Sequence, residues 1–188
     1  MLTFIEQFGR IDILIANAGC SYPVHFDNFN SQTIKKIMST NYFGMVYAIE
    51  AILPHFIKNK SGHIVGMSSQ ASFITSSGSG AYSSSKAAIN LTLESLRIEL
   101  KPIGITVTTI CPGYIKSPMT YVNKFYMPLL MPIDKGCKLI MKAIEKKKQV
   151  FIFPKRLHLM ILLINFLPKK ISHFLFSLPF MKYNKDNK

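Results

Sequence analysis

Acidic residues, cysteines and long apolar runs are scarce in this chain, and each shortage excludes some classes of protein. Of 188 residues only 9 are Asp or Glu, against 23 Lys or Arg. The three cysteines are Cys20, Cys111 and Cys137. Because they are odd in number, far apart and at no zinc-binding spacing, they predict no disulfide framework and no metal site, and they favour a reducing compartment.

No stretch predicts a transmembrane helix or a secretory signal. Residues 157–167 are nearly all apolar, but they number 11, whereas a helix that spans a bilayer needs about 20. The first residues lack the basic stretch followed by an apolar one that is typical of a signal peptide. With 48% hydrophobic residues, the chain is expected to form one domain with a sizeable core.

The positive charge is concentrated in the second half of the chain. Residues 1–99 carry 7 basic and 6 acidic side chains, residues 100–188 carry 16 and 3, and the formal net charge is +14. This gradient indicates either an acidic partner surface, such as anionic lipid or nucleic acid, or only a solvated lysine-rich surface. No nucleic-acid partner is expected, because the chain has no interleaved aromatic stacking platform and no recognised motif for one.

The alternation of strand-like and helix-like segments predicts a parallel α/β sheet. Strands are predicted at residues 11–19, 61–69, 104–113 and 150–153, and helices at 33–57 and 82–100. The apolar run at 11–19 is predicted to be a buried strand that runs into a turn at Asn-Ala-Gly. Because ligands bind beyond the carboxyl ends of such strands, we expect the ends Asn-Ala-Gly, Met-Ser-Ser and Cys-Pro-Gly to face one crevice.

Four polar residues stand at positions that need an explanation. Asn41 lies on the apolar stripe of the first helix, where an unpaired amide would cost about 1–3 kcal/mol. Tyr82 and Lys86 are one turn apart on an inward helix face, and Ser69 ends the middle strand. A nearby ammonium is expected to lower the pKa of the phenol, so that it can exchange a proton with a substrate oxygen near neutral pH.

Five motifs in chain order resemble the short-chain dehydrogenase/reductase family, in its classical branch. They are Asn-Ala-Gly at 17–19, Thr-Asn-x-x-Gly at 40–44, a serine at 69, Tyr-x-x-x-Lys at 82–86 and Pro-Gly at 112–113. The resemblance covers about residues 4 to 153. It implies a Rossmann-like, doubly wound parallel sheet and hydride transfer between a nicotinamide cofactor, NAD or NADP, and a carbonyl or alcohol substrate.

The resemblance also implies a role for each polar residue. Tyr82 would be the catalytic acid/base, and Lys86 would lower its pKa and bind the nicotinamide ribose. Ser69 would polarise the substrate carbonyl, and Asn41 would hold a water in a proton relay. Besides Tyr82 and Lys86, the implied cofactor-binding residues are Asn17, Ala18, Gly19, Pro112, Gly113, Ile115 and Ser117.

The chain departs from the family pattern at its start. No glycine-rich turn follows a strand, and Gly78 and Gly80 lack a third glycine. We therefore expect the first strands and the dinucleotide loop to be absent, with an exposed apolar sheet edge and weak or no dinucleotide binding by the chain alone. The chain would then be a truncated gene product or one whose true start lies upstream. The alternative function is a catalytically inactive fragment, or a membrane-associated binding remnant, of such an enzyme.

A second pattern points to a different reaction. Ser83 and Lys86 fit the Ser-x-x-Lys motif of penicillin-binding hydrolases, in which the serine is acylated. That family also has Ser-Asp-Asn and Lys-Thr-Gly, and neither tripeptide occurs in this chain. The hydrolase is therefore disfavoured.

The predicted boundary divides residues 1–153, a partial dehydrogenase domain, from residues 154–188, an apolar lysine-rich tail. The tail suits an anionic membrane surface; the alternative is a helix that packs on the domain, covers the substrate or forms a dimer seam. An apolar tail beside the site favours a hydrophobic substrate. Helices 33–57 and 82–100 carry apolar residues on more than one face, which suits a homo-oligomer. These features predict a cytoplasmic protein, peripheral at the inner membrane surface if the tail binds lipid.

Overall fold

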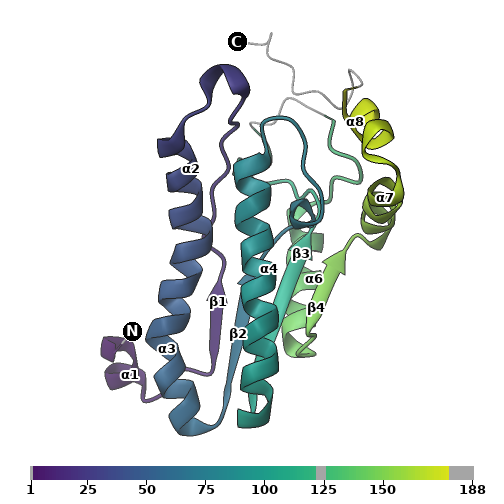
Figure 1. Ribbon diagram of the computed structural model, residues 1–188. Helices are drawn as coiled ribbons and strands as arrows, with labels where there is room; N and C mark the ends of the chain where they lie inside the picture. The colour runs from purple at the N-terminus through teal and green to yellow at the C-terminus, as the bar shows by residue number, and fades with distance from the viewer. Residues whose placement is uncertain (1, 122–125, 178–188) are drawn as a thin grey trace.

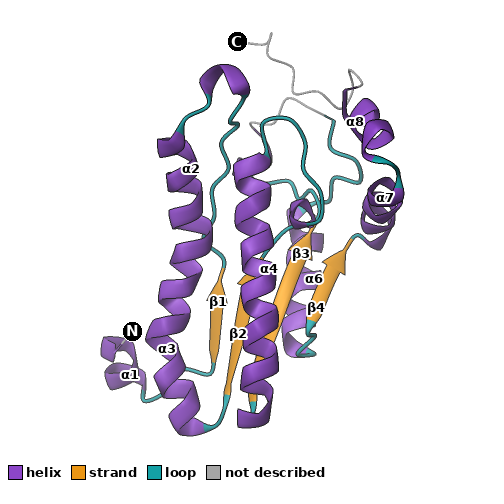
Figure 2. Cartoon of the chain, viewed as in Figure 1, coloured by secondary structure: helices purple, strands orange, loops and turns teal. Residues whose placement is uncertain are grey.

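A four-stranded parallel sheet forms the centre of the molecule (Figures 1 and 2). The computed structural model describes residues 2–121 and 126–177. The strands are β1 (Ile13–Ala16), β2 (Gly62–Met67), β3 (Ile105–Pro112) and β4 (Val150–Phe153), and they lie in the sheet in chain order. All neighbouring strands are parallel, with Leu14 opposite Ile64 and Ile64 opposite Val107. The predicted Rossmann-like α/β fold is confirmed.

Two long helical segments cover one face of the sheet (Figure 1). The first consists of α2 (Ser31–Met38), one π-helical turn (Ser39–Phe43) and α3 (Gly44–Asn59), and the second is α4 (Gly80–Leu100). Asn30 starts α2, because its side chain accepts hydrogen bonds from the backbone N–H groups of the first turn. The predicted helices at 33–57 and 82–100 are therefore confirmed, each a little longer than expected.

The side chains of the central strands alternate between two cores, as the pleat of a strand requires. Ile64 packs with Ile52, Phe56 and Leu93 beneath α3 and α4. Its neighbour Val65 points the other way and packs against α6 (Ile133–Glu145), which covers the opposite face. The sheet is thus sealed on both sides at β2 and β3, and its carboxyl edge is where polar side chains gather.

Shorter elements complete the chain. They are α1 (Leu2–Phe8), α5 (Pro118–Tyr121), α7 (Lys155–Phe166), α8 (Lys169–Ser177) and 3-10 turns at Phe26–Asn28, Gln70–Ser72 and Lys101–Ile103. Within the described ranges, none of the helices has both the length and the apolarity to cross a bilayer. Of the lysine-rich tail expected at 154–188, residues 178–188 lie outside the described residues.

β1 corrects the prediction of a buried strand at 11–19. The strand has only four residues, and Ile13 and Ile15 are 46% and 49% exposed. Leu14 and Ala16 pack on the core beneath α3, so the two isoleucines face the other side of the sheet. In the described part of the chain β1 pairs only with β2. The apolar sheet edge that we expected is therefore present.

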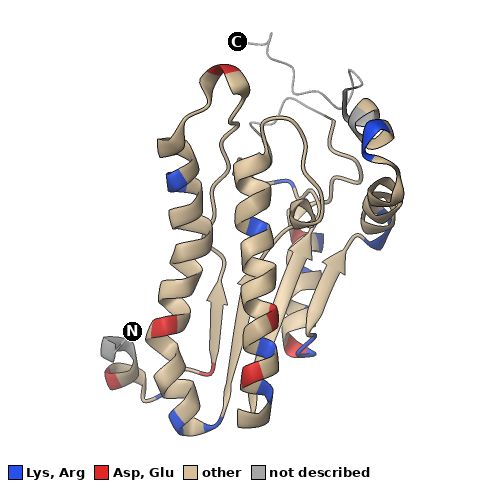
Figure 3. Cartoon of the chain, in the orientation of Figure 1, with Lys and Arg blue, Asp and Glu red and all other residues tan. Residues whose placement is uncertain are grey.

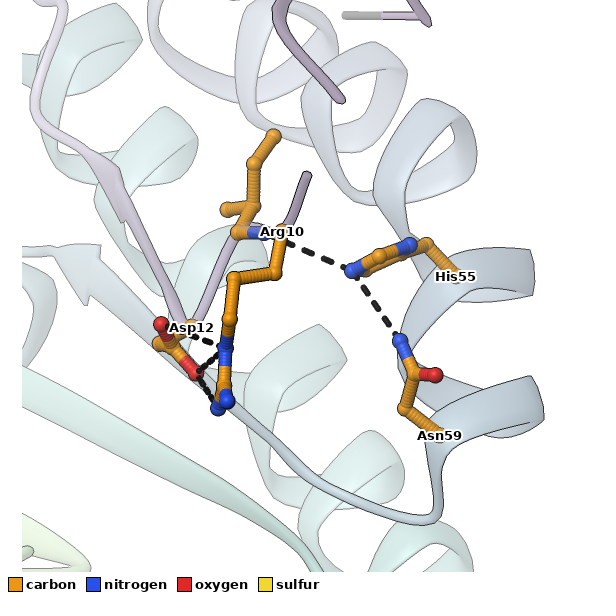
Figure 4. Close-up of polar contacts among 5 residues, drawn as sticks. Arg10, Asp12, His55 and Asn59 are labelled. Carbon is orange, nitrogen blue, oxygen red and sulfur yellow. Dashed lines mark hydrogen bonds and ion pairs between the residues drawn. The ribbon is translucent and has the colours of Figure 1, made fainter. Parts of the chain in front are cut away.

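The start of β1 is held against the end of α3 (Figure 4). The backbone N–H of Ile11 donates to Nε2 of His55 at 3.4 Å, and the Asn59 amide lies 3.1 Å from the same nitrogen. Because both partners are donors, that nitrogen is the acceptor and Nδ1 carries the proton. Arg10 and Asp12 form an exposed ion pair beside it.

Candidate functional site

The predicted site lies where the strands end and α4 begins. The first turn of α4 carries Tyr82 and the second carries Lys86, at the end of the helix that stands beside the strand carboxyl ends (Figure 1). Asn41 comes from the π-helical turn, and Ser69 follows β2. Segments that are distant in sequence therefore meet at one edge of the sheet, as parallel topology predicts.

Asn41 is a fully bonded buried amide, only 1% exposed. Its Oδ1 accepts from the backbone N–H of Cys20 at 2.7 Å, and its Nδ2 donates to the Cys20 carbonyl at 3.0 Å. Nδ2 also donates to Oγ of Ser85 at 2.9 Å. These bonds offset the cost of burying the amide and tie the loop after β1 to α4. Asn41 thus has a structural role, because every polar atom of its amide is hydrogen-bonded. Its place in a proton relay stays a prediction.

Lys86 is a buried ammonium that faces the loop after β1. Its residue is 4% exposed, and Nζ donates to the carbonyl of Met67 at 2.8 Å. Burial lowers the pKa of Lys86 to about 8, an effect that the nearby Cys111 and Cys20 thiols partly oppose. A Cβ built on Gly19 would lie 3.6 Å from Nζ and 3.5 Å from Oδ1 of Asn41. The lack of a side chain at Gly19 therefore keeps space beside the ammonium.

Tyr82 lies beside two other members of the predicted catalytic group, Lys86 and Ser69. The centre of its ring is 5.6 Å from Nζ of Lys86, and the Ser69 side chain is near enough to its phenol to lower the phenol's pKa. Burial raises the pKa of Tyr82, the Ser69 side chain opposes this, and the neighbouring Tyr114 adds to the rise. The net pKa of Tyr82 is therefore raised in this structure and not lowered as expected, because desolvation of the phenol is the largest effect. The effect of Lys86 on the phenol stays a prediction, and its ammonium donates to the Met67 carbonyl.

Ser69 is fixed by its position at the start of a 3-10 turn. Its Oγ accepts from the backbone N–H of Ala71 at 3.1 Å, so the hydroxyl proton is left to be donated to another group. The preceding residue, Ser68, is buried and donates to the Lys86 carbonyl at 3.1 Å. Ser68 therefore holds β2 to α4 beneath the site, and Ser69 faces it.

The structure brings only some of the predicted cofactor residues to this group. Asn17 and Ala18 follow β1 and are exposed, next to Gly19. Ile115 instead packs on the side of the sheet covered by α6, and the Ser117 backbone N–H donates to Oγ1 of Thr120 at 2.9 Å. Ile115 and Ser117 are thus held by contacts with α6 and Thr120, and not by contacts with Tyr82 or Lys86.

Pro112 and Gly113 end β3 beside the start of α7. The backbone N–H of Gly113 donates to the Phe153 carbonyl at 2.7 Å. A Cβ on Gly113 would come within 2.8 Å of Cδ2 of Leu157 and 3.5 Å of Nε2 of Gln70. Glycine is therefore required here by the close approach of α7.

The sequence reasoning missed two polar residues of the site. Ser85 accepts from Asn41 and donates to the Tyr82 carbonyl at 2.7 Å, so it connects the two. Its spacing of three from Tyr82 on an inward helix face could have indicated it. Gln70 is 2% exposed, its Nε2 donates to the Pro154 carbonyl at 3.2 Å, and its Oε1 has no hydrogen-bond partner among the described residues. No pattern in the sequence marks Gln70 beyond its place after Ser69.

Comparison with known proteins gives a consistent result. A family model described as short chain dehydrogenase matches residues 1–124. An uncharacterized oxidoreductase of Myxococcus xanthus (strain DK1622) is 36% identical over 151 residues, which are 80% of this chain and 60% of that protein. Dehydrogenase/reductase SDR family member 7B of Xenopus laevis is 43% identical over 112 residues, or 60% of this chain and 35% of that protein.

Solved structures agree on the fold. A short-chain dehydrogenase from Sphingobium yanoikuyae in complex with NADPH has a TM-score of 0.75 at 20% sequence identity, over 97% of this chain and 72% of that one. At this identity the likeness concerns the fold alone. The chain spans 60% and 35% of the lengths of the two curated relatives named above. Because the family model matches well over half of its residues, the chain belongs to the short-chain dehydrogenase family.

Proposed function

We propose that this chain carries the proton-transfer half of an NAD(P)-dependent oxidoreductase that interconverts a carbonyl and an alcohol. The observation that carries the proposal is the convergence of Ser69, Tyr82 and Lys86 at the carboxyl edge of the sheet. Two neighbouring hydroxyls, with a cation beside the phenol ring, suit the binding of one substrate oxygen.

In this proposal each side chain has a defined task. Tyr82 donates its phenolic proton to the substrate oxygen, and Ser69 donates a hydrogen bond to the same atom. Lys86, whose pKa is lowered to about 8, stabilises the phenolate that remains. Asn41 and Ser85 keep α4 and the loop after β1 in place. A bound nicotinamide would supply or accept the hydride at the substrate carbon.

Tyr82 is a proton donor in this proposal. Since burial raises the pKa of this phenol above its ordinary value, it is protonated near neutral pH. A protonated phenol is the form that gives a proton to the oxygen of a carbonyl being reduced.

The residues fit the nicotinamide end of the cofactor better than its phosphate end. Gly19 leaves room beside the ammonium of Lys86, which can donate to ribose hydroxyls. In the described ranges no strand leads through a glycine-rich turn into a helix, the arrangement that binds a pyrophosphate. We therefore propose that the chain by itself binds NAD or NADP weakly, and tight, saturable binding measured by calorimetry would contradict this.

The test uses a dinucleotide at concentrations high enough to overcome weak binding. The purified chain is mixed with NADH or NADPH and a panel of hydrophobic ketones and aldehydes, and loss of the reduced nicotinamide is followed by absorbance. Tyr82→Phe removes only the phenolic hydroxyl and should lower the rate about 10²–10⁴-fold. The matched control is Tyr47→Phe, on the exposed side of α3, which should leave the rate unchanged. Equal rates in the two variants, or no turnover with any carbonyl, would refute the catalytic proposal and favour an inactive fragment.

We also propose that the outer faces of α3 and α4 form a homo-oligomer interface. Tyr47, Leu91 and Ile98 are 62%, 75% and 70% exposed on these helices. Apolar side chains that are exposed in a row on paired helices indicate a protein–protein contact. Sedimentation velocity of the chain and of the Leu91→Glu/Ile98→Glu variant tests this, because the variant should sediment as a monomer.

A further inference from the structure

After its two basic first residues α7 is mostly apolar around its circumference, yet only one side of it is covered. Leu157 and Ile161, one turn apart, are 7% and 6% exposed and anchor the helix to the domain. The outward residues are Leu159, Met160, Leu162, Leu163 and Phe166, with exposures from 45% to 93%. A helix that is hydrophobic all round is normally buried on both sides, so the outward face of α7 lacks the apolar environment that its residues favour.

α8 extends the exposed apolar surface. It contacts α7, and it follows α7 after a short bend on the same side of the molecule (Figure 1). Ile171 and Phe174 are 47% and 64% exposed. We call the outward residues of α7 together with Ile171 and Phe174 the tail face.

The charges around the tail face are all of one sign. Lys155 and Arg156 begin α7, and Lys169 and Lys170 begin α8, all exposed. Neither helix contains Asp or Glu, and Figure 3 shows only basic positions on them. A second copy of the chain would bring these like charges together, which disfavours a self-association through this face.

From these observations we propose that the tail face docks on an anionic lipid bilayer. The apolar side chains enter the boundary between headgroups and acyl chains, and the four cations lie at the level of the lipid phosphates. α7 has 12 residues and α8 has 9, too few to span the bilayer, so both helices lie along its surface. The packing alternative for this segment accounts for the inner stripe of α7 but leaves the outer face unexplained.

The inner side of α7 connects the tail face to the site. The Pro154 carbonyl accepts from Gln70, and the Asn165 side chain donates to the Phe73 carbonyl at 2.8 Å. The rings of Phe73 and His158 also pack edge to face, 4.9 Å apart. These contacts hold α7 against the turn that follows Ser69. If the proposed function is correct, the site therefore opens beside the bilayer, which suits a lipid-soluble carbonyl substrate.

The test is vesicle binding by the whole chain. The protein is sedimented with vesicles of phosphatidylcholine alone and with vesicles that also contain phosphatidylglycerol, at low and high salt. We expect binding to the mixed vesicles that weakens as salt rises, because surface charges are screened. Lys169→Gln/Lys170→Gln should reduce this binding severalfold, and Leu163→Glu/Phe166→Glu should reduce it tenfold or more.

A matched variant separates this surface from other exposed apolar residues. Ile133→Glu/Met141→Glu places the same two charges on α6, at side chains that are 49% and 51% exposed, and should bind vesicles like the unmodified chain. Circular dichroism and thermal unfolding confirm that each variant is folded. Failure to bind mixed vesicles, or equal binding by the Leu163→Glu/Phe166→Glu variant, would overturn the proposal. If that variant instead converts a dimer to a monomer in sedimentation velocity, the tail face is a contact between two copies. Vesicle binding is measured without substrate, so its result is independent of the catalytic test.

Discussion

The buried ammonium of Lys86 predicts a specific dependence of stability on pH. Its pKa in the folded chain is about 8, against 10.5 for an ordinary lysine. Between these two pH values the unfolded chain holds a proton that the folded chain has released. Unfolding therefore takes up a proton in this range, and the free energy of unfolding rises as the pH rises.

The difference in pKa sets the size of the effect. A gap between about 8 and 10.5 corresponds to about 3 kcal/mol of stability that is absent below pH 8 and present above pH 10.5. Lys86→Met keeps most of the side-chain volume and removes the charge. It also removes the donor to the Met67 carbonyl, which costs about 1 kcal/mol. We expect the variant to be about 2 kcal/mol more stable than the unmodified chain near neutral pH.

Urea unfolding followed by circular dichroism measures the free energy of unfolding of Lys86→Met and of the unmodified chain from about pH 7 to about pH 10. The stability advantage of Lys86→Met should shrink steadily as the pH rises, since the unmodified chain recovers stability when the ammonium is lost. Lys58→Met, at an exposed position of α3, is the control and should show a constant difference. Parallel curves for Lys86→Met, or a loss of stability at neutral pH, would refute the reasoning. If Lys86→Met is more stable near neutral pH, then Lys86 lowers the stability of the folded chain, as functional residues often do.

Three further predictions concern the rest of the fold. Arg97 is buried and donates to β3 and to the loop before β4, so Arg97→Met should lower the free energy of unfolding in urea by about 3 kcal/mol. In Gly66→Ala the new Cβ would overlap Leu93 and should lower the free energy of unfolding by about 1–3 kcal/mol. In Gly80→Ala the Cβ meets open space at the start of α4 and should raise the free energy of unfolding by about 0.5–1 kcal/mol. Calorimetry compares the melting temperatures of the two variants. Burial lowers the pKa of His63, so the folded chain resists its protonation and stability should fall as the pH drops below about 6.5; unfolding curves of His63→Gln should show a weaker decline in acid.

Local patterns were enough to locate most elements of the fold. The apolar run at Val150–Phe153, closed by Pro154, predicted β4 at its observed bounds, and helical spacing predicted the long segment before β2 and α4. α6 was not predicted, although Leu139, Ile140, Ala143 and Ile144 recur at helical spacing and pack on the sheet. The exposure of β1 could not be read from its apolar residues, because it depends on which segments lie against the strand.

The sequence predicted which residues lie at the site better than it predicted their pKa values and hydrogen-bond partners. The spacing of Tyr82 and Lys86 placed them on one face, and that prediction holds in the structure. The direction of the ammonium depends on the Met67 carbonyl, 19 residues away in sequence, which no local pattern reveals. The pKa of Tyr82 likewise depends on burial by distant segments. The catalytic roles themselves stay predictions until they are tested.

The π-helical turn at Ser39–Phe43 makes the helical segment from α2 to α3 sensitive to the insertion or deletion of a residue at this point. Residues Ile37, Asn41 and Met45 are spaced by four, wider than the 3.6-residue repeat of an α-helix, and all three are buried. The π-helical turn, which holds more residues than an α-helical turn, accommodates this wider spacing. A π-helical turn holds one residue more than an α-helical turn, so removing one residue here would leave a regular α-helix and take Asn41 out of register with Cys20 and Ser85. The amide anchor between the loop after β1 and α4 therefore depends on the length of this turn as well as on its side chains.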